Sequence, residues 1–366
     1  MGRPRARDLG IALGSLPPGP LNAITDVPGV RVGHETIVEA DAVRTGVTVV
    51  LPHEGNAWEE PVFAGPHTLN GNGELTGLEW IRESGLLTSP VGLTNTHSVG
   101  VVRDALIAAE VEGRGGDDDF WSLPVVGETW DGTLNDIAGM HVGAGHVRAA
   151  LASAAAGPVA EGNVGGGTGM VCHGFKGGIG TASRVVEAVA AHVVGVLVQA
   201  NYGRRERLRV DGVPVGEAIP PSEVPLPGEP AGGGPGGSIV VLVATSAPLL
   251  PDQCRRLAQR AGLGVARMGG VGENSSGDLF LCFSTGNRGL PAGDHAAATP
   301  ATVAVEMVPG QRLTPLFDAV IEATEEAIVN ALCGAETMVG RKGATAHALP
   351  LERLQELLGR RGAPAR

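Results

Sequence analysis

The chain has 366 residues, of which 43% are apolar and 3% aromatic, and its formal net charge is −12. This composition excludes a disordered chain and predicts a globular protein with a core of small aliphatic side chains. Nucleic acids and anionic membranes are bound by clustered lysine and arginine, so the acidic balance argues against both as the main partner.

Membrane and export signals are not found in the sequence. No apolar stretch approaches the ~20 residues of a membrane-spanning helix. The first residues, Met-Gly-Arg-Pro-Arg, lack the apolar core of a secretory signal peptide. We therefore expect a soluble, cytoplasmic protein.

Cysteine and histidine spacing gives no metal motif. The four cysteines have no CxxC spacing and are expected to be buried free thiols; they are Cys172, Cys254, Cys282 and Cys333. His141 and His146 are five residues apart, and no HExxH pattern occurs. The Gly-rich residues 163–169 lack the Lys-Ser/Thr of a phosphate-binding P-loop. We expect no metal and no other cofactor.

Apolar patterning in the first 200 residues predicts mixed strands and helices. Residues 47–51 and 193–199 are typical of buried strands. Glycine-bounded or Ala-rich helical patterns predict helices over residues 78–84, 99–112 and 142–156. Residues 169–175 and 180–185 resemble the two strands of a β-hairpin joined around Gly177-Gly178.

A Pro- and Gly-rich segment divides the chain. Residues 211–237 contain seven prolines and eight glycines, and the apolar run Ile-Val-Val-Leu-Val-Ala over residues 239–244 follows directly. This predicts a linker that meets a buried strand. Beyond it we expect a helix over 251–261, a strand over 279–283, a long helix capped by Thr314-Pro315 and a last helix over 351–358.

Ser238 lies where the linker ends and the strand begins. Composition alone favours an ordinary junction there. The alternative is that the chain cuts itself between Gly237 and Ser238, which would give Ser238 both a hydroxyl and a free α-amine. An α-amine with a pKa of about 7.7 to 8.0 can act as the base that a serine nucleophile needs. Gly237 suits such a cut because it tolerates strained backbone angles.

Seven motifs follow one another along nearly the whole chain. They are residues 25–34, 70–77 (Asn-Gly-Asn-Gly-Glu-Leu-Thr-Gly), 94–100, 128–136, 163–170, 199–203 and 275–278 (Ser-Ser-Gly-Asp). In order and spacing they resemble the L-aminopeptidase/D-esterase family, that is DmpA and its β-aminopeptidase relatives. The resemblance makes the cut the preferred interpretation of Gly237-Ser238.

The resemblance implies an α+β protein with a DmpA-like four-layer α/β/β/α sandwich, similar to N-terminal nucleophile hydrolases. It implies a single domain over residues 1–366 that cleaves itself into residues 1–237 and 238–366. It also implies a homo-oligomer, commonly a tetramer of cleaved units. The implied activity is that of a self-processing serine aminopeptidase, amidase or esterase, a hydrolase that acts on small peptides, amides or esters with a free amino end.

Site residues carry over position by position from the resemblance. Ser238 is the implied nucleophile and, with Gly237, the cleavage site. The Asn201 amide is the implied oxyanion donor. Ser276 and Asp278 are implied to assist the nucleophile and its amine, and Glu128 to hold the substrate's amino group.

Two of these positions depart from the family pattern. Asp278 stands where relatives often have the longer glutamate. Trp130, two residues after Glu128, replaces a tyrosine or another polar residue, and its indole offers a donor but no hydroxyl. We therefore expect Trp130 either to reshape the substrate pocket or to weaken oxyanion support.

Two other hypotheses stay open at this point. The first is an acyltransferase similar to ornithine acetyltransferase, which shares the self-cleaving architecture but is expected to use threonine rather than Ser238. The second is a non-catalytic relative that kept the fold, which the departures at Trp130 and Asp278 allow.

Overall fold

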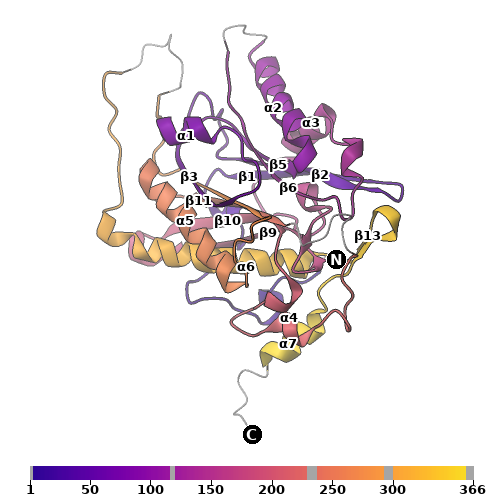
Figure 1. Ribbon diagram of the computed structural model, residues 1–366. Helices are drawn as coiled ribbons and strands as arrows, with labels where there is room; N and C mark the ends of the chain where they lie inside the picture. Colours follow the sequence, from indigo (N-terminus) through magenta and orange to yellow (C-terminus); the bar gives the residue numbers. More distant parts are fainter. Residues whose placement is uncertain (1–2, 116–119, 229–236, 292–299, 360–366) are drawn as a thin grey trace.

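The computed structural model describes residues 3–115, 120–228, 237–291 and 300–359, and two β-sheets lie at its centre (Figure 1). The four-stranded sheet has the order β1 (Arg31–Glu39), β2 (Val43–Leu51), β5 (Val91–Asn95), β6 (Val125–Thr129). The six-stranded sheet has the order β4 (Leu86–Leu87), β3 (Val62–Gly71), β12 (Gly277–Ser284), β11 (Ser238–Thr245), β10 (His192–Asn201), β9 (Gly178–Val186).

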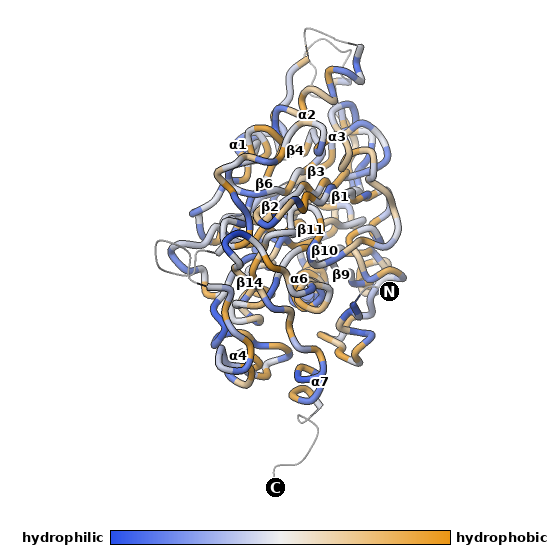
Figure 2. Tube along the Cα trace, turned by 90° about the vertical axis from the view of Figure 1, so that its right-hand side faces the viewer, coloured by the Kyte–Doolittle hydropathy of each residue, from blue (hydrophilic) through white to orange (hydrophobic). Residues whose placement is uncertain are grey.

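Helices cover the outer face of each sheet. α2 (Val99–Gly113) and α3 (Ala144–Ser153) pack on the four-stranded sheet, and α5 (Pro251–Arg267) and α6 (Thr314–Gly334) pack on the six-stranded sheet. In the side view α2 and α3 lie above the strands, and α6 lies along their lower side (Figure 2). The remaining elements are peripheral: α1 (Leu78–Ser84), α4 (Val215–Ala218), α7 (Leu351–Gly359), and the strand pairs β7 (Val171–Cys172) with β8 (Phe175–Lys176) and β13 (Met338–Val339) with β14 (Thr345–Ala346).

Three apolar clusters fill the three spaces between the four layers. β11 shows how the sequence produces them, because all eight of its residues are buried and successive side chains point to opposite faces. Ile239 and Val241 join the cluster beneath α5 and α6, whereas Val240 and Leu242 join the cluster between the sheets. The unbroken apolar run is thus explained by burial on both faces. The predicted four-layer α/β/β/α sandwich is confirmed.

Local predictions agree with the structure over most elements that were expected. The helix over residues 78–84 has the predicted bounds, and the strand that begins at Ser238 forms β11. Several predictions differ in their ends. The helix expected over 142–156 is shorter, α5 continues to Arg267, and Thr314 is the first residue of α6 and not its cap, because Leu313 already has helical angles (φ −78°, ψ −25°). None of the described helices is long and apolar enough to cross a membrane.

The predicted hairpin around Gly177-Gly178 is wrong. β9 pairs along its whole length with β10, while β7 and β8 pair with each other. The turn between β7 and β8 contains His173 (φ 50°) and Gly174 (φ 71°), whose left-handed angles close a tight loop. Part of the predicted linker is also structured, since Val215 and Ile219 are buried in the core. Within residues 211–237, only 229–236 lie outside the described chain.

A buried ionic network joins β9 to α6 and the N-terminal segment. The Arg184 guanidinium is fully buried and contacts Glu326 Oε2 at 2.7 Å and Glu322 Oε2 at 3.1 Å. Arg7 reaches the other Glu326 oxygen at 2.8 Å. Removing one partner of such a network leaves an uncompensated buried charge, which costs more than the net stabilisation that the intact network provides.

We predict that Arg184→Leu lowers the free energy of unfolding by about 3 to 5 kcal/mol. The measurement is urea denaturation in a Ser238→Ala background, which lacks the hydroxyl expected to cut the chain. Arg148→Leu is the control, because the Arg148–Glu112 ion pair is exposed and should contribute less than about 1 kcal/mol. Equal effects of the two substitutions would show that the buried network does not stabilise the fold.

Candidate active site

Ser238 is the first residue of β11, in the middle of the six-stranded sheet. Its register partners are Asn201 on antiparallel β10 and Gly277 on parallel β12. The Gly277 backbone N–H donates to Ser238 Oγ at 3.2 Å, and only 6% of the serine is exposed. Strand register therefore brings Asn201 and the residues beside Gly277 to Ser238, although they lie 37 and about 39 positions away.

Ser276 and Asp278 flank Gly277 and contact each other. Ser276 Oγ donates to Asp278 Oδ1 at 2.6 Å, and Asp278 is the register partner of Ile239 on β11. Burial raises the pKa of Asp278 above its usual value. Asp278 thus lies directly opposite the residue that follows Ser238. An amine created at Ser238 would lie next to this carboxylate.

The Asn-Gly-Asn-Gly motif holds the Ser276 loop in place. The Asn70 amide donates to the carbonyls of Glu273 (2.9 Å) and Ser276, and the Asn72 amide donates to the Ser275 carbonyl at 2.8 Å. A side chain at Gly277 would place Cβ 2.6 Å from the Asn72 oxygen, so this close approach requires glycine. The positioning role of Asn70 and Asn72 was not predicted, although the motif itself was noticed.

Both ends of the Asn201 amide are held. Nδ2 donates to the Trp130 carbonyl at 2.9 Å, and Oδ1 accepts from the Val171 N–H at 2.8 Å. The atom that accepts from the Val171 N–H must be the amide oxygen, so the atom facing the Trp130 carbonyl is Nδ2. Nδ2 carries two hydrogens, and these contacts use only one of them. Trp130 therefore supports Asn201 through its backbone, which any residue at that position can supply.

Lys176 lies beneath the loop that leads to Val171. Its Nζ is fully buried and donates to the carbonyls of Gly177 (2.8 Å), Met170 (2.9 Å) and Gly167 (3.2 Å). Burial lowers its pKa to about 7. Lys176 was not predicted as part of the site. The sequence feature that could have drawn attention to it is the rarity of lysine, since only two of the 27 lysine and arginine residues are lysines.

Glu128 is a buried carboxylate near the end of β6. Its Oε1 accepts from the Glu74 N–H at 3.0 Å, and its Oε2 accepts from the Thr96 hydroxyl. A side chain at Gly73 would place Cβ 3.0 Å from Glu128 Oε1 and 3.0 Å from Gly277 Cα, so this turn connects Glu128 to the Ser238 strands. Burial raises the pKa of Glu128 above its usual value.

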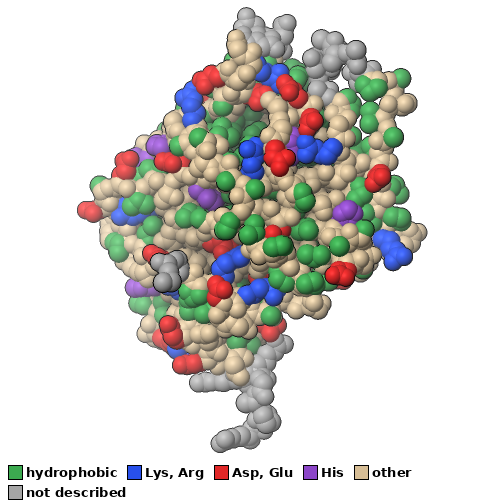
Figure 3. Space-filling model, turned by 180° about the vertical axis from the view of Figure 1, so that it is seen from behind, with side chains coloured by type: hydrophobic (Ala, Val, Ile, Leu, Met, Phe, Trp, Pro, Cys, Tyr) green, Lys and Arg blue, Asp and Glu red, His purple; other side chains and the backbone are tan. Residues whose placement is uncertain are grey.

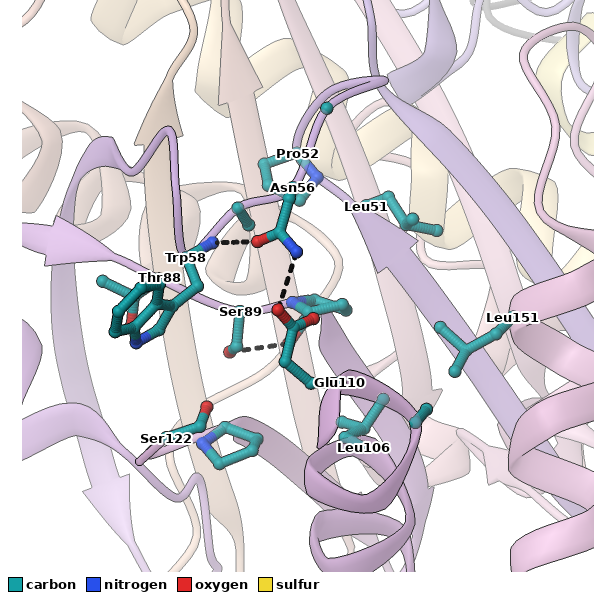
Figure 4. A pocket seen from close by; sticks show the side chains of 15 residues that line it. Leu51, Pro52, Asn56, Trp58, Thr88, Ser89, Leu106, Glu110, Ser122 and Leu151 are labelled. Carbon is teal, nitrogen blue, oxygen red and sulfur yellow. Dashed lines mark hydrogen bonds between the residues drawn. The ribbon is translucent and has the colours of Figure 1, made fainter. Parts of the chain in front are cut away.

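Trp130 lines a hollow of about 640 Å³ together with residues 225–228, 341–345 and His347. The indole therefore shapes a pocket, whereas the backbone carbonyl of the same residue holds Asn201. A second hollow of about 260 Å³ lies at the other end of β5 and β6, near Pro90 and Pro124. In that hollow Asn56 bridges the Trp58 backbone and the Glu110 carboxylate (Figure 4). It is separate from the Ser238 site because Glu128 lies at the opposite end of β6.

Comparison with known proteins decides the family. The model of peptidase family S58 matches residues 22–346. The chain belongs to peptidase family S58. β-Peptidyl aminopeptidase BapA of Sphingosinicella microcystinivorans is 48% identical over 97% of this chain and 92% of the relative, and BapA of Sphingosinicella xenopeptidilytica is 43% identical over 97% and 91%.

Solved structures agree with this S58 assignment. A Burkholderia sp. β-aminopeptidase matches with a TM-score of 0.92 and 56% identity, covering 99% of this chain and 100% of the other. L-Aminopeptidase D-Ala-esterase/amidase from Ochrobactrum anthropi, described as a variant of the Ntn hydrolase fold, matches with a TM-score of 0.89 and 43% identity, covering 99% and 100%. The predicted family and fold are confirmed, and the chain is a hydrolase of the aminopeptidase type.

Proposed function

We propose that this S58 hydrolase matures by cutting its own chain before Ser238 and then uses Ser238 to release N-terminal aminoacyl residues from small peptides, amides or esters. The observation that carries the proposal is the meeting of Ser238, Asn201, Ser276 and Asp278 at one point of the six-stranded sheet. Each role below is inferred from these contacts.

Maturation is proposed to begin with attack of Ser238 Oγ on the Gly237 carbonyl carbon. The peptide C–N bond breaks, the Ser238 nitrogen becomes an amine, and water then hydrolyses the Gly237 ester. Gly237 is packed so tightly that a Cβ would lie 2.7 Å from the Asn201 oxygen and 2.8 Å from Tyr202 Cα. This packing supports a scissile bond held against β10.

Catalysis is proposed to reuse the same serine. The Ser238 amine takes the Oγ proton, Oγ attacks the substrate carbonyl, and the Asn201 amide donates to the resulting oxyanion. The proton passes to the leaving amine, and water releases the acyl group. Asp278 steadies the ammonium form of Ser238, with Ser276 holding Asp278 at 2.6 Å.

Mass spectrometry of the purified protein is the experiment that tests this proposal. We expect two polypeptides, of residues 1–237 and 238–366 when the ends are untrimmed, with Ser238 as the new N-terminus. An intact 37.1 kDa chain without activity on aminoacyl p-nitroanilides would contradict the proposal and favour a non-catalytic relative. The S58 assignment disfavours the acyltransferase alternative.

The substrate class is proposed from the relatives and Glu128. The two BapA relatives and the Burkholderia structure are named for β-peptides or β-amino acids, and we propose that this chain accepts β-aminoacyl substrates. Glu128 would pair with the substrate ammonium group, because its carboxylate is buried beside Gly277. We also propose a cytoplasmic homo-oligomer, such as a tetramer of cleaved units.

We predict that Glu128→Gln lowers kcat/KM for aminoacyl p-nitroanilides about 10²-fold, since a buried charge pair is lost. In the wild type, protonation of Glu128 removes the partner of the ammonium, so kcat/KM falls as the pH drops through the pKa of Glu128, which burial raises above its ordinary value of 4.5. The limb that belongs to Glu128 should disappear in Glu128→Gln, whereas the limb from protonation of the Ser238 amine, the proposed base, should remain.

Glu74→Gln is the control for Glu128→Gln. The Glu74 side chain is exposed, and its contact with Glu128 is made through the backbone N–H, which the substitution keeps. Steady-state rates should stay within a factor of two. A pH profile of Glu128→Gln that matches the wild type would contradict the ammonium-binding role.

A further inference from the structure

The hollow beside Trp130 is enclosed by three chain segments that are far apart in sequence. Its lining includes Trp130, Thr133, Leu226, Arg341, Lys342 and His347. At about 640 Å³ it is large enough for one or two residues of a peptide. The cavity is therefore a candidate subsite that the mechanism above does not use.

The basic wall of this hollow is firmly attached to the active-site loops. Arg341 N–H donates to the Leu134 carbonyl at 2.8 Å, and the His347 carbonyl accepts from the Lys176 N–H at 2.7 Å. Gly340 approaches so closely that a Cβ would lie 2.1 Å from the Leu134 oxygen. The β13–β14 connection is thus fixed to the segment after Trp130, and the residue that follows β14 is fixed to Lys176.

The charge of the hollow opposes that of the molecule. The described lining has Arg341 and Lys342 but no aspartate or glutamate, whereas the chain carries a net charge of −12. Elsewhere acidic and basic side chains are interspersed, as the face in Figure 3 shows. Among the described residues, no ion pair involves the side chain of Arg341 or Lys342, whereas many other arginines pair with a carboxylate.

Lys342 also has an unusual backbone. Its φ of 54° and ψ of 24° are left-handed, which costs a non-glycine residue energy that the surroundings must offset. Arg341, Lys342 and Gly343 form the short turn between β13 and β14. Two cations with no carboxylate partner among the described residues thus line this cavity, and the positive potential that they create there favours an anion.

We propose that this hollow is the leaving-group subsite and that Arg341 and Lys342 bind a carboxylate on the leaving side of the substrate. The inference rests on the proposed function and names its preferred substrates: short peptides whose free C-terminal carboxylate lies within one or two residues of the scissile bond. Glu128 would hold the substrate ammonium, and Arg341 and Lys342 the opposite end. The fixed distance between these two sites would select zwitterionic peptides by their length.

The test compares substrates that differ in one charge. The mature enzyme is assayed with an aminoacyl-alanine dipeptide, its C-terminal amide, the corresponding aminoacyl-glutamate α-amide and an aminoacyl p-nitroanilide. We expect kcat/KM for the free acid to exceed that for the amide about tenfold, the value of one charge-assisted contact of ~1.4 kcal/mol. Added salt should reduce this preference. The glutamate α-amide shows whether a side-chain carboxylate substitutes for the C-terminal one.

The variant Arg341→Gln/Lys342→Gln should abolish the preference and keep p-nitroanilide turnover within a factor of two. The control variant is Arg148→Gln/Arg353→Gln. It removes two positive charges that belong to exposed ion pairs and do not line the hollow, so it should keep the preference. Equal rates for acid and amide in the wild type, or an unchanged preference in the first variant, would overturn the subsite.

The proposed function can fail separately. Should no substrate be turned over, the dipeptides remain intact and are titrated into the protein by calorimetry. Tighter binding of the acid than of the amide, lost in Arg341→Gln/Lys342→Gln, would still support the carboxylate subsite. Equal binding of acid and amide would overturn it.

Discussion

Ser238→Ala should yield a single uncut chain of 37.1 kDa with aminopeptidase activity more than about 10³-fold below that of the wild type. The substitution removes the only atom proposed to attack both Gly237 and the substrate carbonyl. The fold should persist, because the neighbouring β11 residues are buried in two apolar clusters. Denaturing electrophoresis and p-nitroanilide assays measure the two effects together.

Ser246→Ala is the matched control for Ser238→Ala. Ser246 lies just beyond the other end of β11, and its hydroxyl accepts from the Val193 N–H at 3.0 Å. This variant should be cut and active like the wild type. Normal cleavage in Ser238→Ala would refute the serine as the self-cleaving residue. Normal activity with blocked cleavage would separate maturation from catalysis.

Asn201→Ala should lower kcat about 10² to 10³-fold with little change in KM, the effect of losing one oxyanion donor. Asn201→Asp should be at least as slow, because a carboxylate would repel the developing negative charge. Rates are expressed per cleaved molecule, since maturation is proposed to pass through a similar oxyanion. Thermal melting checks that the Val171 and Trp130 contacts are not needed for folding.

Asn287→Ala separates oxyanion support from general bracing. Asn287 makes the same kind of double contact as Asn201, accepting from the Glu306 N–H at 2.9 Å and donating to the Glu306 carbonyl at 3.0 Å. It lies outside the candidate site, so kcat should stay near the wild-type value. A similar loss of kcat in both variants would show that Asn201 acts only by bracing the fold.

Elements with strong local signals were predictable from the sequence. α1 is bounded by Gly77 and Gly85, both in left-handed conformations, and β11 is a continuous apolar run. β3 was not predicted, because Pro66 and His67 weaken any local strand pattern. Pro66 is tolerated since β4 pairs only with Val62 and Phe63 and ends before it. The strand forms because β12 pairs with it across some 200 residues of sequence.

The candidate site was predictable to a similar extent. Family resemblance identified the residues that meet at Ser238, but their supports come from distant segments whose local patterns are uninformative. Thr96 and Glu74 hold Glu128, and Lys176 holds the loop before Val171. Such contacts depend on strand register, which is decided by long-range pairing and not by local propensity.

The strand order of the six-stranded sheet has a consequence for the cleaved protein. β11 and β12 follow Ser238 in the chain, yet they lie between β3 and β10, which precede it. A cut at Ser238 would therefore leave two polypeptides interleaved in one sheet, neither with a complete core of its own. Denatured fragments would have to find each other again before either could fold, so a single hydrolysed bond would turn a first-order folding reaction into a bimolecular one.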